Sequence, residues 1–415
     1  MAHNPTEAEE ERAHFSNVIA TFRNYAQYSL AANNRRRKDI YTLPKADQEL
    51  LDTLGYKKKL DEVDQAILVN ADFLAQIVEN PEIFGHDVDE GDERSGELEQ
   101  GYSHSHDQSG GPSHSHSHSH GQSHHHSHSH SQPRGFHDGP SRRKKYRPTD
   151  FDMDKLRSTL KQFVRDWSEE GKEERELCYK PMRDALLQHF AHVPAEERSN
   201  LRVLVPGAGL GRLAYDIASI GFACQGNEFS HYMLLSSYFI LNRTDAINKH
   251  TFHPYVHSFS NVASRPAMLH AVSIPDVLPS ALPAGSDFSL VAGDFEEIYG
   301  GETDPDEPQS GQWDAILTCF FIDTAKNIVN YLRIIHKILA PGGVWVNLGP
   351  LLWHFENNNT NDPSVELDLD EVKALARAIG FELSNERTVD TTYTSNSQGM
   401  LGYVYHAAFW TATKV

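Results

Sequence analysis

The chain has 415 residues, 39% of them hydrophobic and 10% aromatic, which is enough apolar material for two or three domains' worth of packed structure. Its formal net charge of −20 argues against non-specific binding to nucleic acid, and no apolar run approaches the roughly 20 residues that span a bilayer. Three well-separated cysteines are too few for a disulfide framework, and the polar, acidic start "MAHNPTEAEEERAHF" predicts no signal or transit peptide. We therefore expect a soluble, cytoplasmic protein with neither a membrane nor a nucleic acid as partner.

Helical periodicity covers residues 7–80. The segments "KADQELLDTLG" and "KLDEVDQAILVNADFLAQIVEN" predict two helices, the second ending before Pro81. A longer helix precedes them, with four apolar residues spaced three and four apart on one face: Phe15, Ile19, Phe22 and Tyr25. We expect residues 1–84 to form an N-terminal helical region.

Residues 85–148 contain almost nothing to bury. The tract "YSHSHDQSGGPSHSHSHSHGQSHHHSHSHSQPRG" predicts a disordered insertion, which a surface loop tolerates because loop-closure entropy grows slowly with length. Weak metal binding by its imidazoles is the alternative, but no fixed spacing or cysteine partner defines a closed site, so we assign no metal ligands. The basic run "SRRKKYR" (141–147) is equally typical of a nuclear-import signal and of a solvated linker end, so a nuclear location stays open.

Beyond the insertion the pattern changes twice. The segment "DFDMDKLRSTLKQFVRDWSEEGKEERELCYKPMRDALLQHF" (150–190) predicts helix, with one apolar stripe that includes Leu156, Leu160 and Trp167. From Arg202 onward, strands alternate with helices. That alternation predicts an α/β fold with a mostly parallel sheet covered on both faces.

A glycine-rich turn follows the first of these strands, in "LRVLVPGAGLGRLAYDIASIG" (201–221). Gly207, Gly209 and Gly211 form the turn, and glycine is needed where a ligand approaches the main chain closely or where φ is positive. The next strand, "ACQGNE", ends in Glu228, whose carboxylate can accept hydrogen bonds from a ribose diol. Together these features predict a cofactor that contains adenosine.

The glycine spacing narrows the cofactor class. A dinucleotide fingerprint reads G-x-G-x-x-G, whereas G-A-G-L-G is one residue tighter and resembles the first motif of class I S-adenosylmethionine-dependent methyltransferases. A glycine turn with a purely structural role is the alternative. Three later segments follow in the order of those enzymes: "SLVAGDFEEI" (289–298), "WDAILTCFFID" (313–323) and "IIHKILAPGGVWVNLGP" (334–350).

The resemblance becomes more specific in "LVPGAGLGRLAYDIA", "CQGNEFS", "AGDFEEIY", "TCFFIDTAKNIVNYL", "NLGPLLWHFEN" and "STLKQFVRDWSEEGKEERE". With these segments the chain resembles the carnosine N-methyltransferase family over about 150–410. The resemblance implies a Rossmann-like class I methyltransferase sheet, parallel except for a last strand (402–412) that runs antiparallel between its neighbours. It also implies a helical cap over the cofactor at 149–195 and a methyltransferase domain at 196–415.

That family transfers a methyl group from S-adenosyl-L-methionine to an imidazole nitrogen of a histidyl dipeptide, which converts carnosine to anserine. By resemblance, Glu228 holds the ribose, and Asp294 and Phe295 hold the adenine. Two of the implied residues also have structural interpretations, Arg165 as a solvated helix residue and Cys319 as a small core residue. The full implied cofactor-binding set is Gln162, Arg165, Gly207, Gly209, Gly211, Glu228, Asp294, Phe295 and Cys319.

One carboxylate, Asp323, ends the apolar run in "TCFFIDTAKN" (318–327). Only the unprotonated imidazole nitrogen is nucleophilic, and a carboxylate that accepts N–H from one nitrogen leaves the lone pair on the other. The same carboxylate stabilises the imidazolium that forms as the methyl group arrives. We therefore interpret Asp323 as the catalytic residue that orients the acceptor; the alternative is an N-cap for the following helix.

By resemblance, the acceptor pocket also includes His354 of "PLLWHFEN" and the tyrosines Tyr403 and Tyr405 of "GYVYHAAF", which share a face if they lie on a strand. Packing is the alternative role for the two phenols. A protein-histidine or other N-methyltransferase on a peptide substrate would share every cofactor feature. The methyl acceptor therefore stays open between a histidyl dipeptide and a protein or peptide substrate. The oligomeric state is open as well, with a homodimer among the alternatives.

Overall fold

The computed structural model describes residues 7–79, 146–301, 310–358 and 362–415. The insertion expected at 85–148 lies almost entirely outside these residues, and so does most of the basic run 141–147. Within the described ranges, no helix has both the length and the apolar character that crossing a membrane requires.

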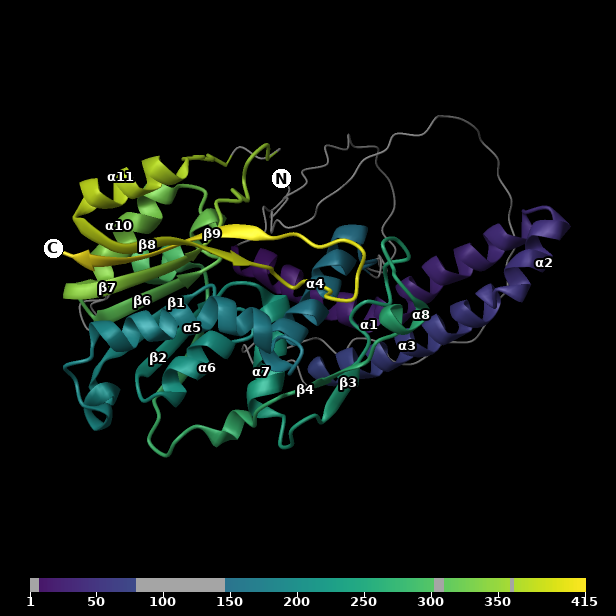
Figure 1. Ribbon diagram of the computed structural model, residues 1–415, viewed down its shortest axis with the longest axis horizontal. Coiled ribbons are helices and arrows are strands. Elements are labelled where there is room, and N and C mark those ends of the chain that lie inside the picture. The colour runs from purple at the N-terminus through teal and green to yellow at the C-terminus, as the bar shows by residue number, and fades with distance from the viewer. Residues whose placement is uncertain (1–6, 80–145, 302–309, 359–361) are drawn as a thin grey trace, which may run out of the picture.

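Three helices form an N-terminal layer that extends from one end of the molecule (Figure 1). They are α1 (Glu7–Tyr41), α2 (Lys45–Thr53) and α3 (Tyr56–Ile77), which confirms the helices predicted there. The predicted apolar face of α1 is buried: Phe15, Ile19, Phe22 and Tyr25 are at most 2% exposed. Removing these side chains from water stabilises the layer against the rest of the chain.

Two further helices lead into the sheet, α4 (Asp150–Trp167) and α5 (Lys172–His189). A capping box begins α4, because the Thr149 side chain accepts from the Asp152 N–H and the Asp152 carboxylate accepts from the Thr149 N–H. The helical stretch expected over 150–190 is interrupted between α4 and α5. At this break the Ser168 hydroxyl accepts a hydrogen bond from the Gly171 N–H. This break separates α4, which lines the pocket, from α5, which covers one face of the sheet.

Seven strands form the central sheet in the order β5-β2-β1-β6-β7-β9-β8. Neighbours from β5 to β7 are parallel, whereas β9 is antiparallel to both β7 and β8. The expected class I methyltransferase sheet, with its last strand inserted antiparallel, is confirmed. The strands are β1 (Arg202–Pro206), β2 (Ala223–Glu228), β5 (Phe288–Ala292), β6 (Trp313–Cys319), β7 (Leu339–Gly349), β8 (Phe381–Thr391) and β9 (Tyr405–Lys414).

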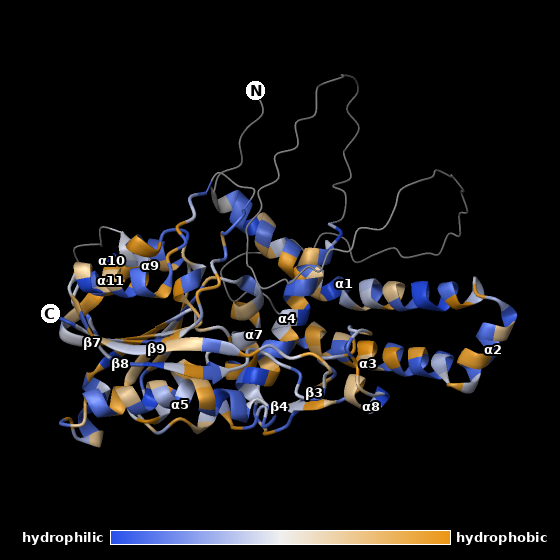
Figure 2. Cartoon of the chain, turned by 45° about the horizontal axis from the view of Figure 1, so that its top comes forward, coloured by the Kyte–Doolittle hydropathy of each residue, from blue (hydrophilic) through white to orange (hydrophobic). Residues whose placement is uncertain are grey.

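Helices cover both faces of this sheet, as Figure 2 shows for α9, α10 and α11 on one side and α5 on the other. Successive side chains of a strand point to opposite faces, so Val203 and Val205 join the core under α5 and α6, while Leu204 joins the core under α10. The covering helices are α6 (Arg212–Ser219), α9 (Phe295–Gly300), α10 (Ile328–Ile338) and α11 (Leu369–Ile379).

The segment between β2 and β5 links the N-terminal layer to the sheet. Phe73 of α3 stacks on Phe252 of β3 with ring centroids 5.0 Å apart, and the Asn70 side chain is bonded to the main chain of His253. Strands β3 and β4 pair antiparallel in a small separate sheet. The elements here are α7 (His231–Asn242), β3 (His250–Phe252), α8 (Arg265–Met268), β4 (Val272–Ile274) and a short 3-10 turn at Pro279–Ala281. Two other 3-10 turns, at Ala195–Asn200 and Ile322–Thr324, lie elsewhere in the domain.

Candidate functional site

A pocket of about 1150 Å³ opens at the carboxyl ends of the parallel strands, with α4 and the start of α1 on its opposite wall. Ligands of open α/β sheets bind at this end of the strands, because the connecting loops diverge there. The wall includes ten of the residues predicted from the sequence: Gln162, Arg165, Gly207, Gly209, Glu228, Asp294, Cys319, Asp323, His354 and Tyr405. Three other predicted residues, Gly211, Phe295 and Tyr403, lie outside the pocket wall.

The glycine turn after β1 brings the main chain to the floor of the pocket. Gly207 has a φ of +66°, and a Cβ there would lie 2.6 Å from Cδ2 of Phe321. Two features therefore require glycine at position 207: the left-handed backbone conformation and the ring of Phe321, which leaves no room for a Cβ. Gly211 serves a different purpose, since it is the residue before the first turn of α6 and packs against Leu241 and Leu290.

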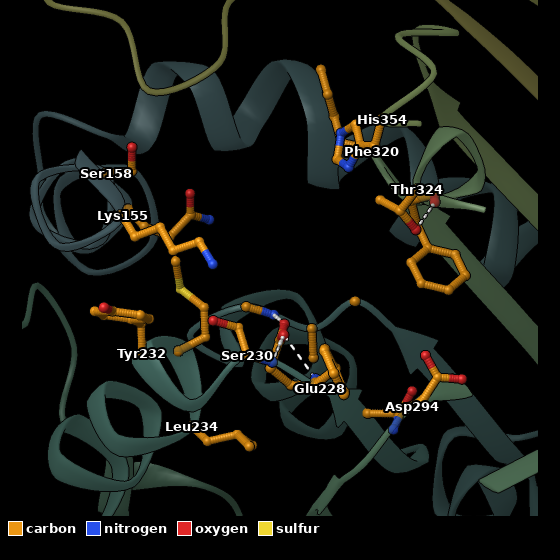
Figure 3. Close-up of a pocket in the computed structure, with 18 of the residues that line it drawn as sticks. Lys155, Ser158, Glu228, Ser230, Tyr232, Leu234, Asp294, Phe320, Thr324 and His354 are labelled. Atoms are coloured by element: carbon orange, nitrogen blue, oxygen red, sulfur yellow. Dashed lines mark hydrogen bonds between the residues drawn. The ribbon is translucent and has the colours of Figure 1, made fainter. Parts of the chain in front are cut away.

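Glu228 ends β2 and is fixed by three main-chain donors (Figure 3). Its Oε2 accepts from the Gly209 N–H, and its Oε1 accepts from the N–H groups of Phe229 and Ser230, each at 2.8 Å. Burial raises the pKa of Glu228, and these three bonds oppose the rise. A carboxylate has about four lone-pair positions, so Glu228 keeps capacity to accept from a ligand hydroxyl.

Asp294 and Phe295 separate in the structure although they are adjacent in sequence. Asp294 caps α9, its Oδ1 accepting from the N–H groups of Glu296 and Glu297 at 2.8 and 3.2 Å. The Phe295 side chain is 3% exposed in the core and contacts the ring of Phe321, 5.3 Å away between centroids. The aromatic surface at this wall of the pocket is thus Phe321.

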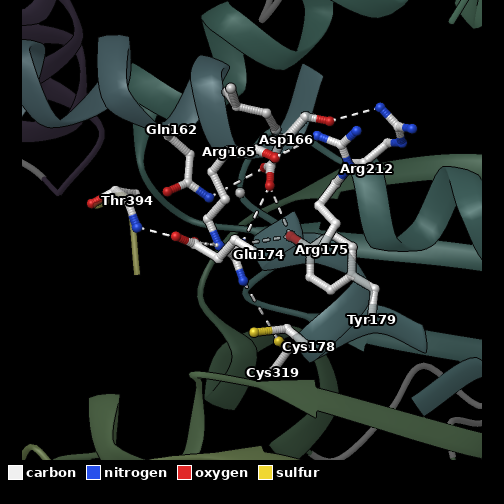
Figure 4. A network of polar contacts seen from close by, with 12 residues as sticks. Gln162, Arg165, Asp166, Glu174, Arg175, Cys178, Tyr179, Arg212, Cys319 and Thr394 are labelled. Atoms are coloured by element: carbon white, nitrogen blue, oxygen red, sulfur yellow. Dashed lines mark hydrogen bonds and ion pairs between the residues drawn. The ribbon is translucent and has the colours of Figure 1, made fainter. Parts of the chain in front are cut away.

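A buried polar network holds the α4 residues (Figure 4). The Arg165 Nε donates to Glu174 Oε1 at 2.7 Å, and its Nη1 donates to Asp166 Oδ1 at 3.2 Å. Gln162 also donates to Asp166, at 3.2 Å. Arg165 is therefore a buried, paired cation in the pocket wall and not a solvated helix residue.

Cys319 is the last residue of β6 and lies 4.0 Å from Arg165 Nη2 through its sulfur. Burial raises the pKa of its thiol to about 12. A neutral thiol is a poor nucleophile, which favours a role for Cys319 in the shape of the pocket wall.

Asp323 lies in the 3-10 turn Ile322–Thr324, just beyond the end of β6, and is 3% exposed. Its Oδ2 accepts from the main-chain N–H of Leu352 at 2.9 Å. Burial raises the pKa of Asp323 to about 7, a rise that the Leu352 bond opposes. The N-cap of α10 is Asn327, whose side chain accepts from the Val329 N–H, so the alternative role of Asp323 as a helix cap is wrong.

The other acceptor candidates come from two loops. His354 follows β7 and lines the pocket, with its main-chain N–H bonded to the carbonyl oxygen of Asp323 at 3.1 Å. Tyr405 begins β9 and lines the pocket near Asp323, whose charge contributes to raising the Tyr405 pKa after burial. Tyr403 precedes the strand and is 53% exposed, so the two phenols do not share the face that a continuous strand would give them.

Phe320 and Tyr393 are among the pocket residues that the sequence reasoning did not identify. Phe320 has a φ of +53°, a conformation that bulky residues seldom adopt outside constrained sites, and its ring contacts Tyr393 and Tyr405 at 4.8 and 5.6 Å. The Tyr393 ring also lies 4.7 Å from the Arg165 guanidinium. The paired phenylalanines of "CFFID" were a signal for the first, whereas "TTYTSN" carries no periodicity that could have found the second.

The donor and acceptor set suits S-adenosyl-L-methionine. Glu228 and Asp294 line the pocket with carboxylates that could accept from ribose hydroxyls or an exocyclic amine, and Arg165 lines it with a guanidinium that could meet a carboxylate. The turn at Gly207 and Gly209 presents main chain without side chains to the same space.

Comparisons with known proteins agree with this chemistry. The family model described as carnosine N-methyltransferase matches residues 142–415. The chain is 38% identical to the carnosine N-methyltransferase of Mus musculus, over 97% of this chain and 86% of that one. It is 47% identical to that of Schizosaccharomyces pombe, over 62% of this chain and 70% of that one.

Among solved structures, a TehB-like SAM-dependent methyltransferase from Corynebacterium glutamicum aligns with a TM-score of 0.31 and 14% identity, over 56% of this chain and 88% of that one. The family match and the curated relatives together cover the sheet, the pocket and most of the N-terminal layer. The chain therefore belongs to the carnosine N-methyltransferase family and is an S-adenosyl-L-methionine-dependent methyltransferase.

Proposed function

We propose that this enzyme methylates an imidazole nitrogen of carnosine, giving anserine, or of a closely related histidyl dipeptide, and that Asp323 orients the acceptor ring. The observation that carries the proposal is the buried Asp323 carboxylate in the same pocket as Glu228, Gly207 and Arg165. The names of the relatives support the acceptor class.

S-adenosylmethionine supplies an already activated methyl group when bound. The main chemical task of the protein is therefore to position the acceptor nitrogen. An acceptor nitrogen must present its lone pair in line at roughly 3–3.5 Å from the carbon that it attacks. Asp323 accepts the N–H of one imidazole nitrogen and so selects the tautomer with the lone pair on the other. Asp323 is 3% exposed, so little water competes for that carboxylate.

Asp323 has a second effect after the new N–C bond forms. The methylated ring is then an imidazolium cation, and the carboxylate opposite its N–H stabilises that charge. With a pKa of about 7, Asp323 can also take up the ring proton and pass it to water as the neutral product leaves. The reaction then balances: the acceptor gains one methyl group and loses one proton, and S-adenosylhomocysteine is the second product.

The N-terminal layer favours a small acceptor. Residues Glu10, Glu11 and His14 of α1 line the same pocket as Asp323 and His354, so a helix covers the side opposite the sheet. His354 and Tyr405 line the same pocket, and we assign them to the polar ends of the dipeptide.

Purified enzyme with S-adenosylmethionine would be supplied separately with carnosine, other histidyl dipeptides, free histidine and a histidine-containing protein digest. Mass spectrometry and NMR of the product would locate a single methyl group on the imidazole ring. Methylated carnosine or a close dipeptide is the expected result. Methylation of protein histidine alone would contradict the dipeptide assignment, and methylation of none of these acceptors would contradict the imidazole.

A further inference from the structure

Both ends of the connection between β8 and β9 line the pocket. The connection leaves β8 after Thr391 and reaches β9 at Tyr405, far longer than the two to five residues of an ordinary hairpin turn. Tyr393 at its start and Tyr405 at its end both line the pocket, and Phe320 contacts both rings. The position of this connection therefore sets the shape of the acceptor side.

One carboxylate holds the start of the connection. Glu174, in the first turn of α5, accepts from the Thr394 N–H at 3.0 Å through Oε1. Its Oε2 accepts from the Thr392 hydroxyl at 2.9 Å and from the Ser395 N–H at 3.5 Å. These bonds join residues more than 200 positions apart, so nothing local in the sequence would place Tyr393 there.

The same carboxylate also binds the cofactor side of the pocket. Glu174 Oε1 accepts from Arg165 Nε at 2.7 Å, and Figure 4 shows Glu174 between Arg165 and Thr394. Tyr393, carried by the connection, lies over the guanidinium of Arg165 at 4.7 Å. Arg165, Glu174 and Tyr393 thus form one contact unit between the two halves of the pocket.

We propose that Glu174 is a positioning residue that couples cofactor binding to acceptor binding, by fixing the β8–β9 connection to Arg165. The proposal rests on the proposed function for its acceptor, while the coupling itself rests on these contacts. A ligand that restricts the motion of Arg165 also restricts Glu174. Glu174 in turn orders residues 392–395, and with them Tyr393 and Tyr405. The acceptor then binds a pocket wall that is already in place, which reduces the ordering cost of binding.

The test compares Glu174→Gln, Thr392→Val, the double variant and the matched control Glu173→Gln, an exposed neighbour in the same turn. Glu174→Gln keeps the size but replaces one accepting oxygen with an amide N–H₂, so we expect the KM for carnosine to rise about tenfold while kcat stays within about threefold. Thr392→Val should show a smaller rise. The double variant should resemble Glu174→Gln alone, because both changes remove the same contact.

A second measurement needs no turnover. Hydrogen exchange of residues 392–404 should slow when S-adenosylhomocysteine is added to the wild type and to Glu173→Gln, and should respond much less in Glu174→Gln. Unchanged carnosine KM in Glu174→Gln, or an undiminished response of exchange to S-adenosylhomocysteine, would overturn the coupling. If the wild type does not accept carnosine at all, the exchange experiment still decides the role of Glu174, so the two proposals fail separately.

Discussion

The main chain of His354 is hydrogen-bonded to the main chain of Asp323, N–H to carbonyl oxygen, at 3.1 Å. The Leu352 N–H, two residues earlier, is bonded to the carboxylate of the same aspartate at 2.9 Å. The segments that leave β6 and β7 are thereby tied together at the pocket. These bonds hold Asp323 and His354, two residues that we assign to acceptor binding, close to each other, which suits the narrow geometric tolerance of methyl transfer.

Asp323→Asn should retain cofactor binding and lower turnover with carnosine by about two to four orders of magnitude, because the amide can still accept from Leu352 but carries no charge for the ring. Steady-state kinetics and calorimetry with S-adenosylhomocysteine measure the two effects. Asp370→Asn, an exposed acid in the first turn of α11, is the control. Turnover close to that of the wild type would rule out the catalytic role.

The stability of Asp323→Asn relative to the wild type should increase as the pH rises. The pKa of Asp323 is about 7 in the folded chain against an ordinary value of 3.8, so between these values the folded state binds more protons than the unfolded state. The free energy of unfolding of the wild type therefore falls with rising pH on account of this group, and asparagine has no such dependence.

From about pH 5 to about pH 8, the stability of Asp323→Asn relative to the wild type should increase on the order of 2 kcal/mol. Denaturant titrations of both proteins at each pH measure this difference. A difference that is constant with pH would mean that Asp323 titrates near its ordinary value.

Gly207→Ala should reduce both stability and cofactor affinity, since the new Cβ would collide with Phe321 and the residue has positive φ. Gly285→Ala is a matched control: its φ is +83°, but nothing lies within 4 Å of its Cβ position. The control isolates the conformational cost, about 1 kcal/mol. Melting temperatures should fall further for Gly207→Ala, and an equal fall in both would show that the Phe321 contact yields easily.

Tyr405→Phe should lower kcat/KM for carnosine by about tenfold, because it removes the hydroxyl that we assign to a polar group of the acceptor and leaves that group unpaired. Tyr403→Phe should have the smaller effect, since Tyr403 is 53% exposed and lies outside the pocket wall. Kinetics of the two variants under identical conditions provide the comparison. The reverse order of effects would mean that the connection before β9 moves when the acceptor binds.

Local patterns in the sequence determined much of the methyltransferase fold. Gly207 and Glu228 could be placed because strand, turn and helix have fixed periodicities, and because the ends of adjacent parallel strands meet at one edge. The antiparallel position of the last strand came from the family resemblance, since no local pattern specifies which strands become neighbours.

Only the tertiary structure decided several roles at the site. Asp323 could be a helix cap or a pocket acid until Asn327 proved to be the cap, and Phe321 replaced Phe295 as the ring facing the pocket. Glu174 and Tyr393 were not identified at all, because their partners lie far away along the chain. The backbone conformation of a segment depends mainly on its own residues, whereas the partner of a buried charge depends on how distant segments pack, and packing is a property of the whole chain.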